Sequence, residues 1–309
     1  MDWKLKFFVQ KTLTRLSANG KLYYFLQRRF GGYRNFNINS KLEQGFLILE
    51  SLNDLGISIV GKDLLEIGTG WVTIIPMLFS IIGHHSCVTY DIENLLKAEL
   101  CLQAAKQLSK LEALIKARIP WAFNTEVSSR QRGLIEQDTM TTLLDFLNVF
   151  PLVGEPNLID DQQNHKFDLV FSNETLEHIQ TQDIIALLQI SKDVLKPNGV
   201  ITHFIDCSDH YSFSDVNISR INFLQFSSSD WQQYNTKFLY QNRLRACDYR
   251  KLFESQGFEI LTWKATVNHD CLNQLVSFPL DKQFVGYDPI DICTSSILVI
   301  ARLKEFSLE

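Results

Sequence analysis

Residues 62–91 contain the pattern that most constrains the fold of this chain. The short apolar segment KDLLEIG runs into two glycines, Gly68 and Gly70, and the apolar segment WVTIIPMLFSIIG follows. A second short apolar segment, SCVTYD, ends at Asp91. The outer segments have the length of buried strands and the middle one that of a helix. The order strand, helix, strand predicts a βαβ unit and therefore a parallel sheet.

The same alternation continues along the chain. Further strands are expected in FDLVFSN, GVITHFID, FEILTW and SSILVIARL. Helices are expected over residues 40–56, 92–117, 132–150, 181–195 and 246–257, and residues 151–165 read as a loop that can hold a short strand. This order predicts one doubly wound α/β domain over residues 57–309, with insertions at about 112–160 and 207–242. An N-terminal helical addition over residues 1–56 precedes it.

Composition and charge exclude several classes of protein. The chain has 309 residues, of which 45% are hydrophobic, so it can bury a large core. Its net charge of −5 gives no sign of nucleic-acid binding, and no nucleic-acid-binding module is visible. The six cysteines form no CxxC pair, which is typical of reduced thiols. Since neither a membrane span nor a signal peptide is visible, we expect a cytoplasmic protein.

The first 41 residues form a basic arm. They carry nine basic residues and one acidic residue, Asp2. Five apolar residues follow helical spacing, namely Leu5, Phe8, Val9, Leu13 and Leu16. A basic amphipathic helix of this kind can lie on an anionic membrane, and it can equally pack on the domain with a solvated basic face. We therefore expect a helix here and keep peripheral membrane contact as one of two interpretations.

The glycine turn after the first strand is typical of a ligand-binding site. Glycine lets the backbone approach a ligand closely, and the helix N-terminus offers free N–H groups. Asp91 ends the next strand, where nucleotide-binding proteins place an acid on ribose hydroxyls. A nicotinamide site needs G-x-G-x-x-G, but position 73 is threonine. Glu66 lies two residues before the first glycine and suits a cationic ligand better than a pyrophosphate, so a NAD-dependent dehydrogenase is the weaker alternative.

Four segments, taken in order, resemble a known family. LEIGTGWV, VTYDIENL, FDLVFSNETLEHI and LKPNGVI are similar to the ordered motifs of class I S-adenosylmethionine-dependent methyltransferases. The resemblance covers roughly residues 60–205 and continues through LFESQGFEI and SILVIARL. It implies a Rossmann-like sheet that is mostly parallel, with an antiparallel last strand in SSILVIARL. It also implies S-adenosyl-L-methionine as cofactor.

The resemblance assigns roles to individual residues. Glu66, Gly68 and Gly70 match the motif around the methionine part of the cofactor. Four further positions match the family's pattern: Asp91 for the ribose, Ile92 beside adenine, Asp160 or Asp161 (Asp161 preferred) for the adenine amino group, and Asn173 at the methionine end. Glu174 and His178 match the family's ExLEH sequence. Val72 replaces the frequent third glycine, so we expect the helix to begin slightly farther from the strand.

Histidines near the predicted strand ends are candidates for the catalytic base, because a hydroxyl acceptor benefits from a base with a near-neutral pKa. His210 lies just past a strand end and is our first choice, with His178 second. His203 lies within the strand, where a core position is expected. A metal site from His203, Asp206, Asp209 and His210 is disfavoured, because alternation along a strand sends these side chains to different faces. We therefore predict no metal.

The segment after the fifth strand is the expected substrate-recognition region. It mixes aromatic residues with arginines, which can stack on sugars and clamp phosphate or carboxylate. We predict contacts from Tyr211, Arg243 and Arg245, although an ordinary packed segment would have the same composition. The prediction is O-methylation of a small molecule or glycan. The alternative from another class is a non-catalytic cofactor-binding protein on the same fold.

Overall fold

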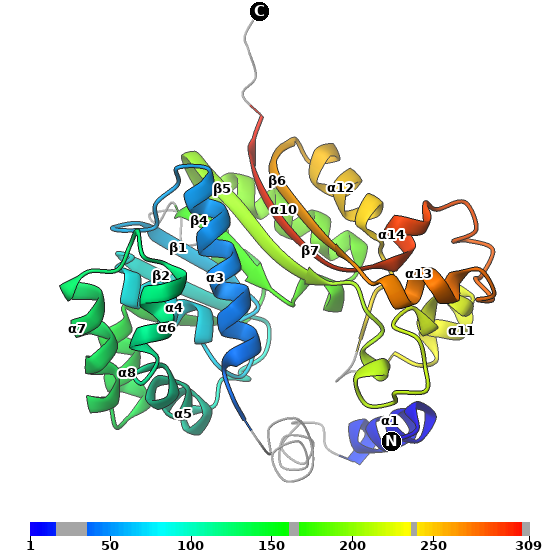
Figure 1. Ribbon diagram of the computed structural model, residues 1–309, viewed down its shortest axis with the longest axis horizontal. Helices are drawn as coiled ribbons and strands as arrows, with labels where there is room; N and C mark the ends of the chain where they lie inside the picture. The colour runs from blue at the N-terminus through cyan, green and yellow to red at the C-terminus, as the bar shows by residue number, and fades with distance from the viewer. Residues whose placement is uncertain (17–35, 161–166, 236–239, 305–309) are drawn as a thin grey trace, which may run out of the picture.

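A seven-stranded sheet forms the centre of the molecule (Figure 1). The computed structural model describes residues 1–16, 36–160, 167–235 and 240–304. The strands are β1 (Asp63–Ile67), β2 (Ser86–Asp91), β3 (Val149–Val153), β4 (Phe167–Asn173), β5 (Leu195–Asp206), β6 (Phe258–Val267) and β7 (Thr294–Leu303). They lie in the order β3-β2-β1-β4-β5-β7-β6. Strands β1 to β5 are parallel and β7 lies antiparallel to both neighbours, which confirms the predicted fold class.

Two layers of helices bury the two faces of the sheet. Helices α3 (Asn39–Asp54), α4 (Ile74–Ile82) and α5 (Ala98–Leu108) pack on one face, and α10 (Thr181–Val194) and α12 (Ala246–Ser255) on the other. Each face of the sheet has its own hydrophobic cluster. Successive side chains of β1 point to opposite faces, so Leu64 packs in the cluster with α3, α4 and α5, and Leu65 in the cluster with α10 and α12. This burial on both faces explains why the strand sequences read as continuous apolar runs.

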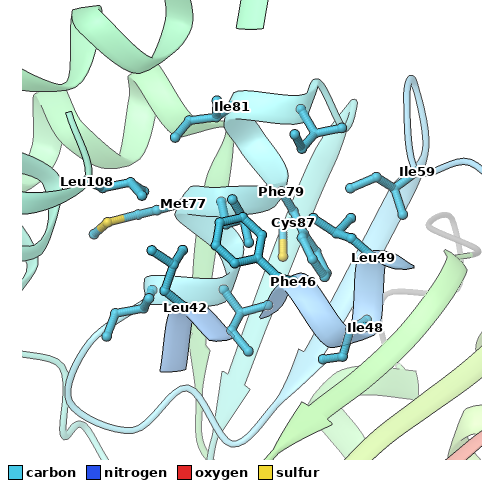
Figure 2. Close-up of a cluster of buried hydrophobic side chains, with 14 of the residues drawn as sticks. Leu42, Phe46, Ile48, Leu49, Ile59, Met77, Phe79, Ile81, Cys87 and Leu108 are labelled. Atoms are coloured by element: carbon cyan, nitrogen blue, oxygen red, sulfur yellow. The ribbon is translucent and has the colours of Figure 1, made fainter. Parts of the chain in front are cut away.

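Helix α3 belongs to this core. Figure 2 shows Phe46 and Leu49 of α3 beside Phe79 of α4 and Cys87 of β2. The expected boundary after residue 56 places α3 in the N-terminal addition, whereas the structure packs its apolar face against the sheet layer. The reason is that α3 and α4 each present an apolar stripe, and the two stripes bury one another.

Helix α1 (Trp3–Leu16) packs elsewhere, on a third apolar cluster. In Figure 1 it lies beside α11 (Ser228–Gln232) and α13 (His269–Leu275), away from α3. The side chain of Trp3 is buried against Tyr211 and Tyr234 of the segment after β5. The exposed apolar side chains of α1 include Leu5, Phe8 and Val9. Helices α1 and α3 thus belong to two different hydrophobic cores.

The single helix predicted over residues 92–117 is wrong. The structure has α5, which begins at Ala98, and a separate α6 (Glu112–Arg118). The side chain of Gln131 donates a hydrogen bond of 2.8 Å to the carbonyl of Leu108, the last residue of α5. A long-range contact therefore takes the place of the next helical turn, and local helix propensity could not reveal it.

Residues 112–160 contribute to the sheet, although the sequence suggested an insertion there. The range holds α6, α7 (Thr125–Gly133), α8 (Met140–Leu147), β3 and the short α9 (Asn157–Asp160). The single helix predicted over residues 132–150 is wrong, because α7 ends at Gly133, a 3-10 turn covers Leu134–Glu136 and α8 begins only at Met140. Helix α8 ends at Leu147, where Asn148 adopts a left-handed conformation with φ of 51°. Val149 and Phe150 then pair with β2 as part of the edge strand β3.

Short elements fill the region beyond β5. Single helical turns lie at His210–Phe213 and Asn222–Gln225, followed by α11. Helices α13 and α14 (Pro289–Cys293) connect β6 to β7, and the sequence analysis predicted neither. No helix within the described residues is both long enough and apolar enough to cross a membrane.

Candidate active site

A cavity of about 480 Å³ opens at the carboxyl ends of β1 and β4. This volume lies within the range of small-molecule sites. The cavity is lined by residues from β1, the following turn, α4, the β4 end and α3, among them Lys41, Glu66, Gly68, Thr69, Gly70, Trp71, Ile75, Asn173 and Glu174. Four predicted cofactor residues, Glu66, Gly68, Gly70 and Asn173, therefore line the same cavity.

Glu66 is the least satisfied polar group of this cavity. Its side chain is 5% exposed, and its Oε2 atom has no hydrogen-bond partner among the described residues. Burial raises the pKa of Glu66 well above its ordinary value, an effect that nearby Asp91 adds to and Lys41 opposes. A buried carboxylate without a partner is unfavourable unless a donor or cation reaches it. The cavity thus offers an acceptor for a cationic or N–H-bearing ligand.

The two glycines of the turn have different structural roles. Gly68 has φ of 85° and lies so close to Thr175 that an added Cβ would be 2.4 Å from its side chain. Gly70 has φ of 62° but has open space around it. After this turn, α4 begins at Ile74. Glycine at position 68 therefore allows close packing against Thr175. Glycine at position 70 allows the positive φ of the turn and leaves the cavity open to a ligand.

Asp91 lies at the rim of the cavity and shapes the turn. Its two carboxylate oxygens accept hydrogen bonds from the backbone N–H groups of Gly70 (2.9 Å) and Glu93 (3.1 Å). Burial raises the pKa of Asp91, and these backbone donors oppose that rise. Its neighbour Ile92 is 62% exposed. Both residues lie at the end of β2, as predicted, but outside the wall of the cavity. Asp161 lies outside the described residues.

Helix α3 supplies polar groups that the sequence analysis missed. Gln44 accepts a hydrogen bond of 2.8 Å from the side-chain amide of Asn173 and donates one to Glu174. Lys41 forms an ion pair of 2.7 Å with Glu174. These contacts join positions about 130 residues apart along the chain. The basic character of the arm was visible in the sequence, but nothing local marked Lys41 or Gln44 as partners of the β4 end.

A second group of polar side chains lies at the ends of β4 and β5. We call Glu177, His178, Asp206 and His210 the imidazole cluster. The ring centroids of His178 and His210 are 4.9 Å apart, and Nε2 of His210 is 3.3 Å from Oδ2 of Asp206. Nδ1 of His178 donates a hydrogen bond of 2.7 Å to the carbonyl of Tyr240. Both histidines proposed as bases are therefore together, next to the turn that carries Asn173 and Glu174.

Packing changes the ionisation of this cluster. Although part of the His178 side chain is open to solvent, desolvation of its ring and the adjacent His210 lower the pKa of His178 to about 4. Burial opposes ionisation of Asp206, but His210 and the N–H of Ser208 hold the pKa of its carboxyl below the ordinary value. Burial raises the pKa of Glu177 well above its ordinary value. The cluster thus combines a neutral imidazole with closely spaced carboxyl groups.

The family is decided by the match to a protein-family model. A model described as a methyltransferase domain matches residues 43–262, which is more than half of the chain. The chain belongs to this methyltransferase family. The match begins within α3 and ends within β6, so it spans both the cavity and the imidazole cluster. The family predicted from the motifs is confirmed, and it supports S-adenosylmethionine as the cofactor.

Solved structures of methyltransferases resemble this methyltransferase domain at low identity. The magnesium protoporphyrin IX methyltransferase from Synechocystis is 14% identical with a TM-score of 0.45, and the match covers 95% of this chain and 100% of that chain. An S-adenosylmethionine-dependent methyltransferase from Mesorhizobium loti is 15% identical, with a TM-score of 0.42 and coverage of 82% and 96%. One from Clostridium acetobutylicum is 13% identical, with a TM-score of 0.44 and coverage of 94% and 100%. No curated protein matches the chain.

His203 has the core position expected for it. The ring lies within β5, where it hydrogen-bonds to the hydroxyl of Ser172 at 2.7 Å and stacks on Phe253. Burial lowers the pKa of His203 to about 3. This histidine is a neutral packing residue of the methyltransferase domain.

Two of the three predicted substrate contacts are wrong. Tyr211 is buried, packs on Trp3 and donates a hydrogen bond of 2.9 Å to the carbonyl of Tyr234. The guanidinium of Arg245 is fully buried and donates to the carbonyls of Cys207, Asp291, Ile292 and Thr294. The polar atoms of both side chains form hydrogen bonds with backbone carbonyls of the methyltransferase domain. Both residues therefore stabilise the fold.

Arg243 has an intermediate position. It donates hydrogen bonds to the carbonyls of Phe223 and Phe226, which ties two loops together. It also lines an open groove of about 500 Å³ with Trp231, Tyr240, Phe284 and Tyr287. Tyr240 connects this groove to the imidazole cluster through its carbonyl bond to His178. Of the predicted substrate residues, only Arg243 remains beside a surface that could receive an acceptor.

Proposed function

We propose that this protein transfers a methyl group from S-adenosylmethionine to a hydroxyl group of a small molecule or glycan. The buried carboxylate of Glu66, which lacks a partner inside a cavity of suitable size, carries the proposal. Methyl transfer is the reaction that the family implies.

The residues in and beside the cavity suit the chemical groups of S-adenosylmethionine. Glu66 and Asn173 offer unpartnered oxygen atoms in or beside the cavity, where the amino group of the methionine part needs acceptors. Gly68 and Gly70 keep the turn free of side chains. Asp91 is at the rim, where its carboxylate would accept from ribose hydroxyls. When bound, the sulfonium of S-adenosylmethionine supplies an electrophilic methyl group.

The imidazole cluster is the proposed place where the acceptor oxygen is activated. Glu177 and His178 follow Asn173 and Glu174 in the turn after β4. The imidazole of His178 donates to the carbonyl of Tyr240, and Nε2 of His210 lies 3.3 Å from the carboxylate of Asp206. A hydroxyl is a poor nucleophile until its proton is removed or its pKa is lowered. The groove beside Tyr240 and Arg243 has aromatic and polar walls, which suits a ring-bearing or sugar-like acceptor.

Titration calorimetry tests the cofactor. We expect micromolar binding of S-adenosylhomocysteine and no binding of NADH. Asp91→Ala should weaken binding by about 1–3 kcal/mol through lost charged hydrogen bonds. Asp91→Asn, which retains an oxygen acceptor for the Gly70 N–H, is the matched control for the shape of the turn. Absence of binding to the wild type would favour the non-catalytic alternative, and NADH binding would favour the dehydrogenase.

Methyl transfer is tested next with a panel of hydroxylated sugars and phosphorylated acceptors. Release of S-adenosylhomocysteine and a methyl ether in the product would support O-methylation. Cofactor binding together with methylation on nitrogen or sulfur would overturn the acceptor class but leave methyl transfer intact.

We also propose that α1 brings the protein to an anionic membrane. Leu5, Phe8 and Val9 are exposed, and Phe8 is 65% exposed. Lys4 and Lys11 on the same helix are exposed as well. Apolar and basic side chains exposed together favour an interfacial helix. Cosedimentation with vesicles containing phosphatidylserine should exceed that with neutral vesicles, and Phe8→Ser should reduce it. Equal binding to both vesicle types would argue against this contact.

A further inference from the structure

The imidazole cluster contains a carboxylate that no protein group satisfies. Glu177 is 1% exposed, and neither of its side-chain oxygens has a hydrogen-bond partner within the described residues. Ligand atoms of Glu177, His178 and His210 all lie within 4.8 Å of one another. Burying a carboxylate without a partner is strongly unfavourable, and a bound cation would offset this cost. In the described part of the chain, no lysine or arginine forms an ion pair with Glu177.

The two histidines are already oriented as ligands. His178 donates its Nδ1–H to the carbonyl of Tyr240, which leaves the lone pair of Nε2 available. One ring nitrogen of His210, Nε2, lies beside the carboxylate of Asp206 at 3.3 Å. Metal-bound histidines commonly use one nitrogen for the ion and the other for a carbonyl or carboxylate that fixes the ring. Tyr240 and Asp206 have the positions of such outer partners.

We propose that Glu177, His178 and His210 bind a divalent transition-metal ion, with Zn²⁺ and Mn²⁺ as the first candidates. Two imidazoles and one carboxylate form a ligand set suited to such ions. Zinc ligands lie about 2.0–2.2 Å from the ion, so two ligand atoms can be at most about 4.4 Å apart. Small rotations of the side chains would bring the observed set within that limit. No metal was expected from the sequence, because the set considered there, His203, Asp206, Asp209 and His210, came only from β5 and the turn after it and did not include Glu177 or His178.

The backbone around the site is held firmly enough to preorganise it. The N–H of Asn242 donates to the carbonyl of Glu177 at 2.8 Å. The side-chain amide of Asn242 donates to the carbonyls of Leu176 (2.8 Å) and Ile179 (2.9 Å). Gln241 accepts from the N–H of His210 at 3.1 Å. Residues 241 and 242 therefore link the two turns that carry the three ligands, which fixes their separation.

Three protein ligands leave positions open on the ion. This role rests on the proposed function: the acceptor hydroxyl would occupy an open position, where a cation lowers its pKa. The turn that carries Glu177 also carries Asn173 and Glu174, which line the cofactor cavity. In this arrangement, the two imidazoles hold the ion, and the proton of the acceptor hydroxyl would pass to solvent water.

Metal binding to the full chain tests the proposal without any acceptor. The protein is stripped with a chelator, dialysed, and titrated with Co²⁺ while its visible absorption is followed, and then with Zn²⁺ and Mn²⁺ in calorimetry. We expect one equivalent of metal ion to bind. Removing an outer partner of a metal site commonly weakens metal binding by about 10- to 100-fold. His178→Ala and Glu177→Gln remove direct ligands, so each should weaken metal binding by about 100-fold or more. Asp206→Asn should weaken it by about 10- to 100-fold.

His269→Ala is the matched control, since His269 is an exposed histidine on α13 outside the cluster. It should leave metal binding unchanged. Glu177→Gln keeps the size of the side chain and removes a buried charge, so the metal-free variant should unfold at the same temperature as the metal-free wild type or higher. A folded Glu177→Gln protein that binds metal like the wild type would overturn the proposal, as would wild-type protein that binds no metal.

Binding of S-adenosylhomocysteine is measured on the same samples. Cofactor binding without metal binding would overturn the metal site and leave the proposed function standing. Metal binding without cofactor binding would support the metal site and contradict the proposed function. The two failures are therefore distinguishable.

Discussion

The cofactor cavity and the segment after β5 are both built at the carboxyl edge of one sheet, but they differ in how they arise. In the cavity, Glu66, Gly68 and Gly70 come from five consecutive residues of β1 and its turn, and they lie together because the strand ends there. After β5, Tyr211 and Arg245 are separated by long irregular stretches, and their surroundings come from α1, α13 and α14. The first region is a local motif and the second is a packed core of its own.

The difference explains which residue positions could be inferred from the local sequence and which could not. A glycine with positive φ or an acid at a strand end has a role that depends on the backbone nearby. An arginine in an irregular segment has five donors, and only the surrounding fold decides whether they meet a ligand or backbone carbonyls. Arg245 donates to carbonyls on two segments far apart in the chain, at Cys207 and at residues 291–294. The comparison can be tested by substitutions that should act on binding in one region and on stability in the other.

The largest loss of stability is expected on substitution of Arg245. Arg245→Ala would leave several buried carbonyls without donors, and at about 1–3 kcal/mol for each such group the free energy of unfolding should fall by about 3–6 kcal/mol. Urea unfolding followed by circular dichroism measures this. Arg302→Ala, which removes an exposed ion pair with Glu259, should cost no more than about 1 kcal/mol. A stable Arg245→Ala protein with a raised acceptor KM would restore the substrate role.

Substitution of Gly68 or Gly70 should give the next largest loss of stability. Gly68→Ala adds a Cβ that clashes with Thr175 at a positive φ, so it should lower stability by about 3 kcal/mol. Gly70→Ala has the same backbone strain but open space, so about 1 kcal/mol is expected. Both variants are compared by urea unfolding and by S-adenosylhomocysteine titration. Equal losses of stability would show that the contact with Thr175 has no energetic role.

His210→Ala should reduce turnover by about 100-fold or more, equivalent to about 2.7 kcal/mol of transition-state free energy. Cofactor affinity should stay unchanged, because His210 belongs to the imidazole cluster and not to the wall of the cavity. Single-turnover methyl transfer and calorimetry separate the two quantities. His85→Ala, an exposed histidine outside the site, is the control. Normal turnover in His210→Ala would remove this residue from the reaction.

Glu66→Gln should change stability and binding in opposite directions. Because burial raises the pKa of Glu66, the free protein loses stability as the pH rises above the ordinary value of 4.5. The glutamine variant lacks this loss, so it should be more stable than the wild type at neutral pH and show a flatter dependence on pH. Its affinity for S-adenosylhomocysteine should be weaker by about 1–3 kcal/mol. Destabilisation at neutral pH would mean that the carboxylate has a partner in the free protein.

The sequence by itself determined the fold class, the family and the glycine turn that lines the candidate cofactor cavity. Alternating apolar strands and helices admit few arrangements, and the glycine turn with its acids at strand ends depends on local backbone geometry. The paired histidines could be proposed singly, because each follows a strand end. Their convergence with Glu177 was not visible, since it depends on the pairing of β4 with β5 and on the hydrogen bonds of Gln241 and Asn242.

Only the tertiary structure decided how the remaining segments pack. It divided residues 92–117 into two helices through the contact of Gln131 with Leu108, and it added β3 to the sheet from a range that read as an insertion. It also placed Lys41 and Gln44 beside Glu174 and turned Tyr211 and Arg245 into structural residues. In each case the deciding contact joins residues far apart in the chain. Local propensity carries no information about such partners, because burial and hydrogen bonding are settled only when the whole core assembles.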